Sequence, residues 1–207
     1  MEKRVVKENA PLSRIESRKI EFRGKITAAA LKLFEEQGVA DTSVASIIKE
    51  AGIAHKTFFN YFPTKNHLLL QIVSDFSDHA YAEFRKDFKT NTDPRKRIEY
   101  CFASIAEALE PLNPNYKELF NFYLISGAGS AELRRSQKDK FFGVVSEIMG
   151  DANAEEMLRP GFSMETLTEI VVGICVSILL SWSLEDDYPL VNKMKKSIHF
   201  INESVFV

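Results

Sequence analysis

The chain has 207 residues, of which 45% are hydrophobic and 27% charged, and its formal net charge is −2. This composition is near the average for soluble globular domains and excludes a disordered chain. Nine glycines and seven prolines are few for a turn-dense all-β protein, and two cysteines, Cys101 and Cys175, are too few for a disulfide scaffold or a cysteine-based zinc site. No apolar stretch follows Met1, so we expect no signal peptide. The longest apolar run, residues 170–182, is shorter than the roughly 20 residues that span a bilayer, so we expect a cytoplasmic protein without a membrane partner.

The charge is divided unevenly along the chain. The first 66 residues contain 12 Lys and Arg against 8 Asp and Glu, whereas the remainder contains 15 against 21. A net of +4 is therefore followed by a net of −6. Such an asymmetry favours a front part that meets a polyanion and a back part that does not, although solvated surfaces also differ in charge by chance.

The first third of the chain predicts an arm followed by three helices. Residues 1–18 are polar, basic and aperiodic, which is typical of a flexible arm. Residues 41–43 (Asp, Thr, Ser) are suited to cap a short helix that is broken at 51–53 (Ala, Gly, Ile), and a second short helix is expected over 54–62. An amphipathic helix ending at Gly38 is expected before these two short helices. It is indicated by apolar residues at spacings of three and four: Ile26, Ala29, Ala30, Leu33 and Phe34.

The rest of the chain shows helical periodicity throughout. Thr64 is suited to cap a long helix, Pro94 to open the next one and Pro189 to open the last. With no strand, repeat or low-complexity signal, the sequence predicts an all-α chain of about nine helices. Three further helices are expected over 119–125, 131–149 and 164–184.

Two short helices joined by a glycine-containing turn form the pattern of a helix-turn-helix. In this motif the first helix lies across the DNA backbone, so the N–H groups at Thr42 and Ser43 are candidates to bind a phosphate oxygen. Gly52 allows the tight turn, and the second helix enters the major groove with its N-terminal residues nearest the base edges.

The residues of this region resemble the TetR family of bacterial transcriptional regulators. The resemblance covers roughly residues 20–72, with the order and spacing of the motifs intact. It is carried by ITAAALKLFEEQG over 26–38, by Thr42-Ser43-Val44 with Ile47, by Ala51-Gly52-Ile53, by TFFNYF over 57–62, and by Lys65 with Leu68-Leu69.

This resemblance implies a ligand-responsive homodimeric regulator, more commonly a repressor, that binds a palindromic DNA operator and is released by a small effector. It also implies three parts: a flexible basic arm over 1–18, a three-helix DNA-binding head over 19–66, and a helical domain for ligand binding and dimerisation over 67–207.

Carried over by position, the family pattern implies contacts to the DNA backbone from Thr42, Ser43, Thr57 and Lys65. Tyr61 stands where the family often places a residue that bonds to phosphate. Arg14, Arg18 and Arg23 either reach the backbone or the minor groove, or belong to an arm without a role.

Base reading falls on the second short helix. Lys56 or His55 is suited to donate to guanine acceptors, and Asn60 to pair with adenine. Two residues depart from the family pattern: Phe59 replaces the usual tyrosine, which leaves packing or a thymine-methyl contact, and Lys56 replaces a small residue. The alternative for His55 is a solvated surface residue, whereas Phe58 and Phe62 are expected to be core residues that hold the helix.

The last two helices are the candidates for dimerisation, because they would form a four-helix bundle with those of a second subunit. The alternative is that both helices belong to the core of one subunit. The residues expected at the interface are Ile174, Ile178, Val191, Met194, Ile198, Ile201 and Val205.

The middle helices are the candidates for a regulatory pocket. Aromatic and aliphatic walls with few polar groups favour an apolar or aromatic effector, although a Phe stripe at helical spacing is also typical of plain core. The residues expected to line the pocket are Cys101, Phe102, Phe120, Tyr123, Phe142 and Trp182.

No catalytic set, cofactor motif or metal-ligand cluster stands out in the sequence. Ser46 and Lys49 have the S-x-x-K spacing of serine hydrolases, but they lie inside the helix-turn-helix without the partner motifs. The glycine-rich residues 127–129 follow no strand, which argues against a dinucleotide site. We therefore expect no enzyme, no cofactor and no metal. The alternative function is a helical protein–protein adaptor with a degenerate DNA-binding head, which would show no salt-sensitive preference for a specific duplex.

Overall fold

The computed structural model describes residues 13–88, 91–112, 114–122, 124 and 131–207. Within these residues the chain forms nine α-helices and one short 3-10 helix, with no β-strand, which confirms the predicted all-α fold. The helices are α1 (Arg14–Asp41), α2 (Val44–Ala51), α3 (His55–Tyr61), α4 (Lys65–Asp87), α5 (Pro94–Leu109), η1 (Pro114–Tyr116), α6 (Lys117–Asn121), α7 (Ala131–Ala154), α8 (Met164–Leu184) and α9 (Leu190–Ser204).

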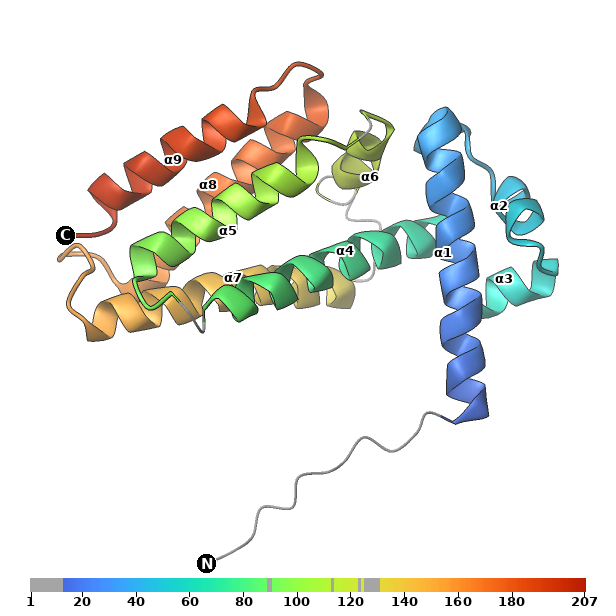
Figure 1. The fold of residues 1–207 in the computed structure, drawn as a ribbon, viewed down its shortest axis with the longest axis horizontal. Helices are drawn as coiled ribbons and strands as arrows, with labels where there is room; N and C mark the ends of the chain where they lie inside the picture. Colours follow the sequence, from blue (N-terminus) through green and yellow to red (C-terminus); the bar gives the residue numbers. More distant parts are fainter. Residues whose placement is uncertain (1–12, 89–90, 113, 123, 125–130) are drawn as a thin grey trace, which may run out of the picture.

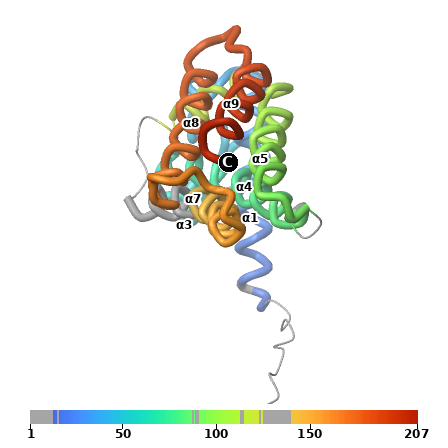
Figure 2. Tube along the Cα trace, turned by 90° about the vertical axis from the view of Figure 1, so that its left-hand side faces the viewer, coloured from blue at the N-terminus to red at the C-terminus, as the bar shows by residue number. Residues whose placement is uncertain are grey.

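The helices pack around two hydrophobic clusters. Figure 1 shows α1, α2 and α3 as a head at one end of the molecule, with α4 running from the head into a body made of α5, α7, α8 and α9. Figure 2, seen from the end of the body, shows these helices arranged around a common core. The head cluster includes residues from the first turns of α4 and Leu119 of α6, so α4 and α6 are the elements that join head and body.

Local capping signals account for most of the helix boundaries. Ser43 and Thr64 each accept a hydrogen bond from a backbone N–H three residues ahead, which begins α2 and α4. Gly52 adopts the left-handed conformation at φ 62°, which ends α2 at the expected turn. Asp93 caps α5, whose first residue is Pro94 as predicted.

Helix α1 begins earlier than the apolar periodicity of the sequence predicts. Residues 1–12 of the predicted arm lie outside the described residues, but residues 14–18 are helical, so the aperiodic assignment is wrong for them. The reason is a capping box: Ser13 Oγ accepts from Glu16 N at 3.2 Å, while Glu16 Oε2 accepts from Ser13 N at 2.9 Å. At the other end, Gly38 leaves the helical conformation at φ 82° and kinks the chain ahead of Val39–Asp41.

Helix α9 packs on the core of its own subunit. Its apolar stripe lies against α5 and α8, so the dimer-interface assignment is wrong for four residues whose side chains are buried within one chain: Ile178, Met194, Ile201 and Val205. Ile174, Val191 and Ile198 are partly buried against the same cluster. A stripe at spacings of three and four shows that a helix buries one face, but not whether the partner is the same chain or a second one.

Helix α8 is long and apolar enough, by length and composition, to cross a membrane. In this fold it instead packs against α6, α7 and α9, and one face is buried in the body core. We therefore interpret α8 as a core helix with a second, exposed face.

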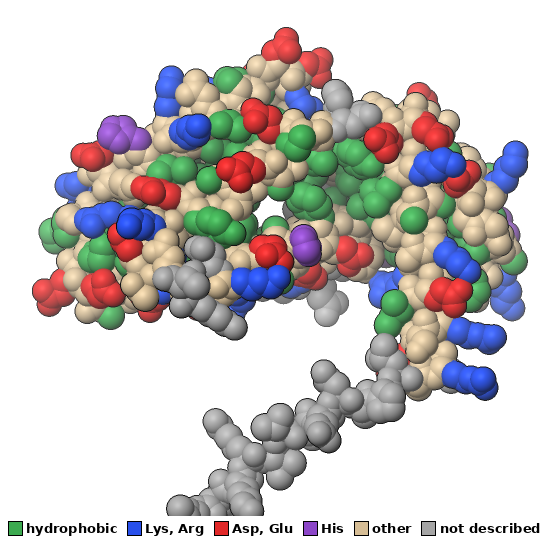
Figure 3. Space-filling model, in the orientation of Figure 1, with side chains coloured by type: hydrophobic (Ala, Val, Ile, Leu, Met, Phe, Trp, Pro, Cys, Tyr) green, Lys and Arg blue, Asp and Glu red, His purple; other side chains and the backbone are tan. Residues whose placement is uncertain are grey.

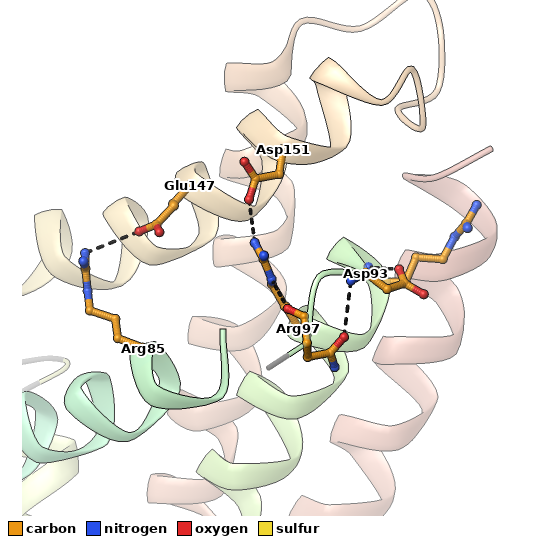
Figure 4. Close-up of polar contacts among 7 residues, drawn as sticks. Arg85, Asp93, Arg97, Glu147 and Asp151 are labelled. Atoms are coloured by element: carbon orange, nitrogen blue, oxygen red, sulfur yellow. Dashed lines mark hydrogen bonds and ion pairs between the residues drawn. The ribbon is translucent and has the colours of Figure 1, made fainter. Parts of the chain in front are cut away.

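Polar contacts fix the end of the body that is farthest from the head (Figure 4). Arg97 on α5 is buried, and its guanidinium donates to Asp151 Oδ2 on α7 at 2.5 Å and to the Asn91 carbonyl at 2.7 Å. Arg85 near the end of α4 pairs with Glu147 on α7 at 3.5 Å. The far end of α4 is thus held against α7, whereas its first turns belong to the head.

Candidate DNA-binding head and ligand cavity

Helix α3 presents a polar, exposed face on a buried apolar support. Phe58 and Phe62 are buried in the head cluster, as predicted, and they fix the orientation of the helix. His55, Lys56 and Asn60 are exposed, and so is Phe59, whose ring packs on His55 with centroids 4.7 Å apart. Base contact by these side chains stays a prediction, and their exposure is the condition it requires.

Two other residues expected to contact phosphate also belong to α3. Thr57 and Tyr61 are both partly buried. The Tyr61 ring stacks on Phe22 of α1, with centroids 6.0 Å apart and an interplanar angle of 27°. This contact fixes which face of α1 is turned toward α3.

Thr42 closes the turn between α1 and α2 and is not available to DNA. Its side chain is 1% exposed, and its hydroxyl donates to the Gly38 carbonyl at 2.7 Å while accepting from Gln37 Nε2 at 3.2 Å. Its backbone N–H donates to the Val39 carbonyl at 3.4 Å. The predicted phosphate contact from Thr42 is therefore wrong, because the kink at Gly38 uses these groups internally. Ser43 stays exposed at the N-terminus of α2.

Lys65 is also held inside the structure. Its ammonium donates to the Val39 carbonyl, which lies beyond the kink at Gly38. Burial lowers the pKa of Lys65 below its ordinary value, although the carboxylates of Glu118 and Asp41 partly oppose this. In this structure Lys65 ties the start of α4 to the end of α1, and its contact with phosphate stays a prediction.

The segment formed by η1 and α6 holds the same end of α1 from the other side, and we call its three hydrogen-bonding residues the α6 clamp. Glu118 Oε2 accepts from the backbone N–H groups of Val39 at 2.9 Å and Ala40 at 3.0 Å. Asn115 Nδ2 donates to the Glu35 carbonyl at 3.0 Å, and the Tyr116 hydroxyl lies 3.4 Å from the Leu31 carbonyl. Burial raises the pKa of Tyr116. Sequence reasoning missed this clamp, because about 80 residues separate its partners.

A cavity of about 580 Å³ lies between α4, α5, α6, α7 and α8. Phe120 and Phe142 line it, as predicted. Cys101 and Phe102 instead are fully buried in the body core, and Trp182 packs edge-on against Phe120 with centroids 5.5 Å apart, so the assignment of these three to the lining is wrong. Tyr123 lies outside the described residues. Sequence reasoning missed the contribution of α4, whose lining residues are Val73, Phe76, Ser77, Ala80, Tyr81 and Phe84.

The described lining of this cavity is almost entirely apolar. Its polar side chains are Ser77, Tyr81, Ser104 and Glu169, and Glu169 is the only charged one among the described lining residues. In the part of the chain that the structure describes, no group of three or more His, Cys, Asp or Glu is placed to hold a metal ion. The chemistry of the site is therefore that of an apolar binding cavity.

Comparison with known proteins places this geometry in a family. The model of the family "Bacterial regulatory proteins, tetR family" matches residues 26–72, which include the helix-turn-helix. The uncharacterized HTH-type transcriptional regulator YdgC of Bacillus subtilis is 31% identical over 177 residues, covering 82% of this chain and 85% of YdgC. The chain belongs to the TetR family. It is therefore a DNA-binding transcriptional regulator of the helix-turn-helix type, as the sequence predicted.

Two further TetR-type matches extend over most of the chain. The transcriptional activator FasR of Mycolicibacterium smegmatis is 24% identical over 175 residues, covering 82% of this chain and 75% of FasR. The TetR-family repressor FadR of Thermus thermophilus, solved in complex with lauroyl-CoA, superimposes with a TM-score of 0.68 at 24% identity, covering 89% of this chain and 95% of FadR. The latter likeness shows that the fold extends through the body as well as the head.

Proposed function

We propose that the protein is a homodimeric, ligand-responsive repressor that acts in the cytoplasm, binds a palindromic DNA operator and is released by a small apolar effector. The observation that carries this proposal is the exposed face of α3, where His55, Lys56 and Asn60 stand on a buried support in a TetR-family helix-turn-helix. Lys56 and His55 supply donors for guanine, and Asn60 supplies the amide that pairs with adenine. Ser43 at the start of α2 and Thr57 on α3 remain the candidates for the DNA backbone.

Dimerisation is proposed to use the exposed face of α8 together with the outer face of α9. Large apolar side chains are exposed there, and the most exposed are Leu184 at 57% and Phe200 at 54%. Ile170 is also exposed on α8, on the same side of the helix as Leu184. Pairing these faces across a two-fold axis would form a four-helix bundle and would cover apolar side chains that water otherwise solvates.

Selection of bound sequences from a random duplex pool is expected to enrich a palindrome. Two heads related by a two-fold axis read two inverted half-sites, so the winning duplexes should show both. Binding should weaken steeply as salt rises, because several counterions are released from the DNA. Enrichment of no duplex, or of a single unpaired half-site, would contradict the proposal, and the former would favour the adaptor.

The double variant Leu184→Glu, Phe200→Glu tests the proposed dimer interface in the same selection experiment. We expect monomers by sedimentation and loss of the preference for two half-sites, since charge cannot be buried at the proposed interface. Ile20→Glu, at an equally exposed apolar residue of α1, should remain dimeric.

The effector is proposed to place an apolar chain or ring system in the cavity of about 580 Å³. The support is the lining, which combines six aromatic side chains with aliphatic ones: Phe76, Tyr81, Phe84, Phe120, Phe141 and Phe142. A related fold, the FadR of T. thermophilus, was solved with lauroyl-CoA. Lauroyl-CoA is therefore the first compound to test.

The selected duplex provides the assay for the effector. Lauroyl-CoA and a set of uncharged apolar aromatic compounds are titrated into the protein–duplex complex, and anisotropy reports release. We expect at least one class to release the duplex from the native protein but not from Ala80→Trp, in which the indole fills part of the cavity. Equal release from both proteins would show that the compound acts elsewhere. If neither class releases the duplex, the proposed effector chemistry is wrong.

The switch is proposed to act through α4 and α6 together. Phe120 and Leu124 line the cavity, whereas Glu118 and Leu119 contact the head. A ligand that displaces Phe120 therefore moves the α6 clamp, while α4 carries the first turns that pack against α3. Because the far end of α4 is held to α7, the displacement is expected at the head. It changes the distance between the two heads of the dimer, which then no longer matches the spacing of the half-sites.

A further inference from the structure

The first two turns of α1 extend beyond the core of the head. Figure 1 shows this end of α1 reaching past α3. Every side chain described between Arg14 and Glu21 is exposed, and contact with the head begins at Phe22, which is partly buried. The segment Arg14–Glu21, which we call the α1 extension, therefore does not serve the packing of the head.

The α1 extension is nevertheless an ordered helix. The capping box between Ser13 and Glu16 satisfies the first backbone N–H groups and begins the helix at Arg14. Side chains on the extension are thus held on a continuous rod that is fixed to the head through Ile26, Ala30 and the rest of the buried face of α1.

The stack of Phe22 on Tyr61 defines which way the extension faces. An α-helix turns about 100° per residue, so Arg18 lies about 40° from the direction of Phe22, and Arg14 about 80° from it in the same sense. With a rise of 1.5 Å per residue, the two arginines stand about 6 and 12 Å beyond Phe22 along the axis. Arg18 therefore lies close to the side of α1 that faces Tyr61, and Arg14 lies about a quarter turn from it, one turn farther out. Figure 3 shows Lys and Arg side chains gathered at this end of α1 on that side.

The two arginines also have charge available for a partner. Glu16 is used in the capping box, and Glu21 pairs with Lys25 at 2.8 Å. Lys25 above all, and more weakly Arg18, lowers the pKa of the Glu21 carboxyl group, but among the described residues neither Arg14 nor Arg18 has a side-chain hydrogen bond or a salt bridge. Exposed guanidinium groups on the DNA-facing side of a binding head suit the phosphate groups of a duplex.

We propose that the α1 extension is a second DNA-contacting element, in which Arg14 and Arg18 bind backbone phosphates next to the base pairs read by α3. The inference rests on the proposed function, since it takes the duplex as the ligand of the head. Contacts to phosphate set position and affinity but carry no sequence information. The extension therefore adds affinity and a larger footprint without changing the operator sequence.

The test compares full-length native protein with the double variant Arg14→Gln, Arg18→Gln on the selected duplex. A dimer would lose four cationic contacts, so the slope of log affinity against log salt should become shallower by about 3 to 4, with affinity near physiological salt falling about 10- to 100-fold. Ethylation interference should lose phosphates beside each half-site, and selection with the variant should return the same palindrome.

The control is Lys96→Gln with Lys195→Gln, which removes the same charge from exposed positions on α5 and α9 of the body. It should leave the salt slope unchanged. If the arginine variant keeps the native slope and affinity, or returns a different palindrome, the inference is overturned while the proposed function stands. If native protein enriches no duplex, the proposed function itself has failed. Both arginines are exposed, so equal melting temperatures are expected and establish that the variant is folded.

Discussion

Alanine at both Lys56 and Asn60 is expected to lower the affinity for the selected operator about a thousandfold. Each good contact to a base edge contributes about 1 to 3 kcal/mol, and a dimer that loses four of them loses at least about 4 kcal/mol. Both side chains are exposed on α3, so their removal leaves the buried support of Phe58 and Phe62 unchanged. Fluorescence anisotropy with the selected duplex and with a scrambled duplex measures the loss.

The two duplexes separate base reading from general attraction. The double variant should lose most of its preference for the operator over the scrambled duplex, because two of the three proposed base-reading side chains are gone, His55 alone is left, and the backbone contacts remain. Lys49→Ala, at an exposed lysine in the last turn of α2, serves as the control and should preserve the preference for the operator. A Lys56 and Asn60 variant that still prefers the operator a hundredfold would show that other residues read the sequence.

Only substitutions on the exposed face of the helix-turn-helix test DNA recognition separately from folding. Phe58 is fully buried in the head cluster, so its replacement by alanine would leave a cavity and destabilise the head, whatever α3 binds. Loss of binding in such a variant would not identify α3 as the reading element. The exposed face of the helix is the part whose removal tests recognition without testing folding.

Local signals made most of the fold predictable from the sequence. A capping hydroxyl at Thr64, a proline at Pro94 and a glycine at Gly52 act within one turn of their own position, so their effects are visible in a short window. The bounds of α8 were predicted from its long apolar stretch, and the structure shows Ser163 as its cap. The capping box of Ser13 and Glu16 is an equally local signal, and it places the start of α1 at Arg14.

Several contacts that the sequence did not predict form around the kink at Gly38 or between residues distant in the sequence. Thr42 and Lys65 have the polar character and position of phosphate ligands, and in this structure each donates to a backbone carbonyl that the kink at Gly38 leaves free of the helix. Nothing near Lys65 indicates that the carbonyl of Val39, 26 residues away, lies within its reach. The cavity shows the same limit, because a stripe such as Phe76, Ala80 and Phe84 looks the same whether a neighbouring helix fills the space beside it or leaves it open.

Within the α6 clamp, Glu118 is the residue that holds the segment after Gly38. Glu118 accepts two backbone N–H groups at the kink, and the same carboxylate raises the pKa of Lys65 against the effect of burial. The lysine in turn donates to the carbonyl of Val39. Both sides of the peptide segment after Gly38 are thus held by charged groups, one from α6 and one from α4, which are the two helices proposed to transmit the switch.

Replacing Glu118 by alanine is therefore expected to loosen the segment between α1 and α2 and to weaken operator binding. Hydrogen bonds to a charged acceptor contribute about 1.5 to 3 kcal/mol each, and because Glu118 is exposed and water replaces part of the loss, we expect a net cost of about 1 to 2 kcal/mol. Amide hydrogen exchange at Val39 and Ala40 should accelerate roughly 5- to 30-fold, and operator affinity should fall by a similar factor, because the head must then be ordered on binding. Glu118→Gln keeps an acceptor oxygen and should show a smaller effect, and Glu110→Ala, at an exposed residue just after α5, should show none. Unchanged exchange at both amides in Glu118→Ala would mean that the clamp does not order the head, and the route from Phe120 through α6 would have to be abandoned in favour of α4 alone.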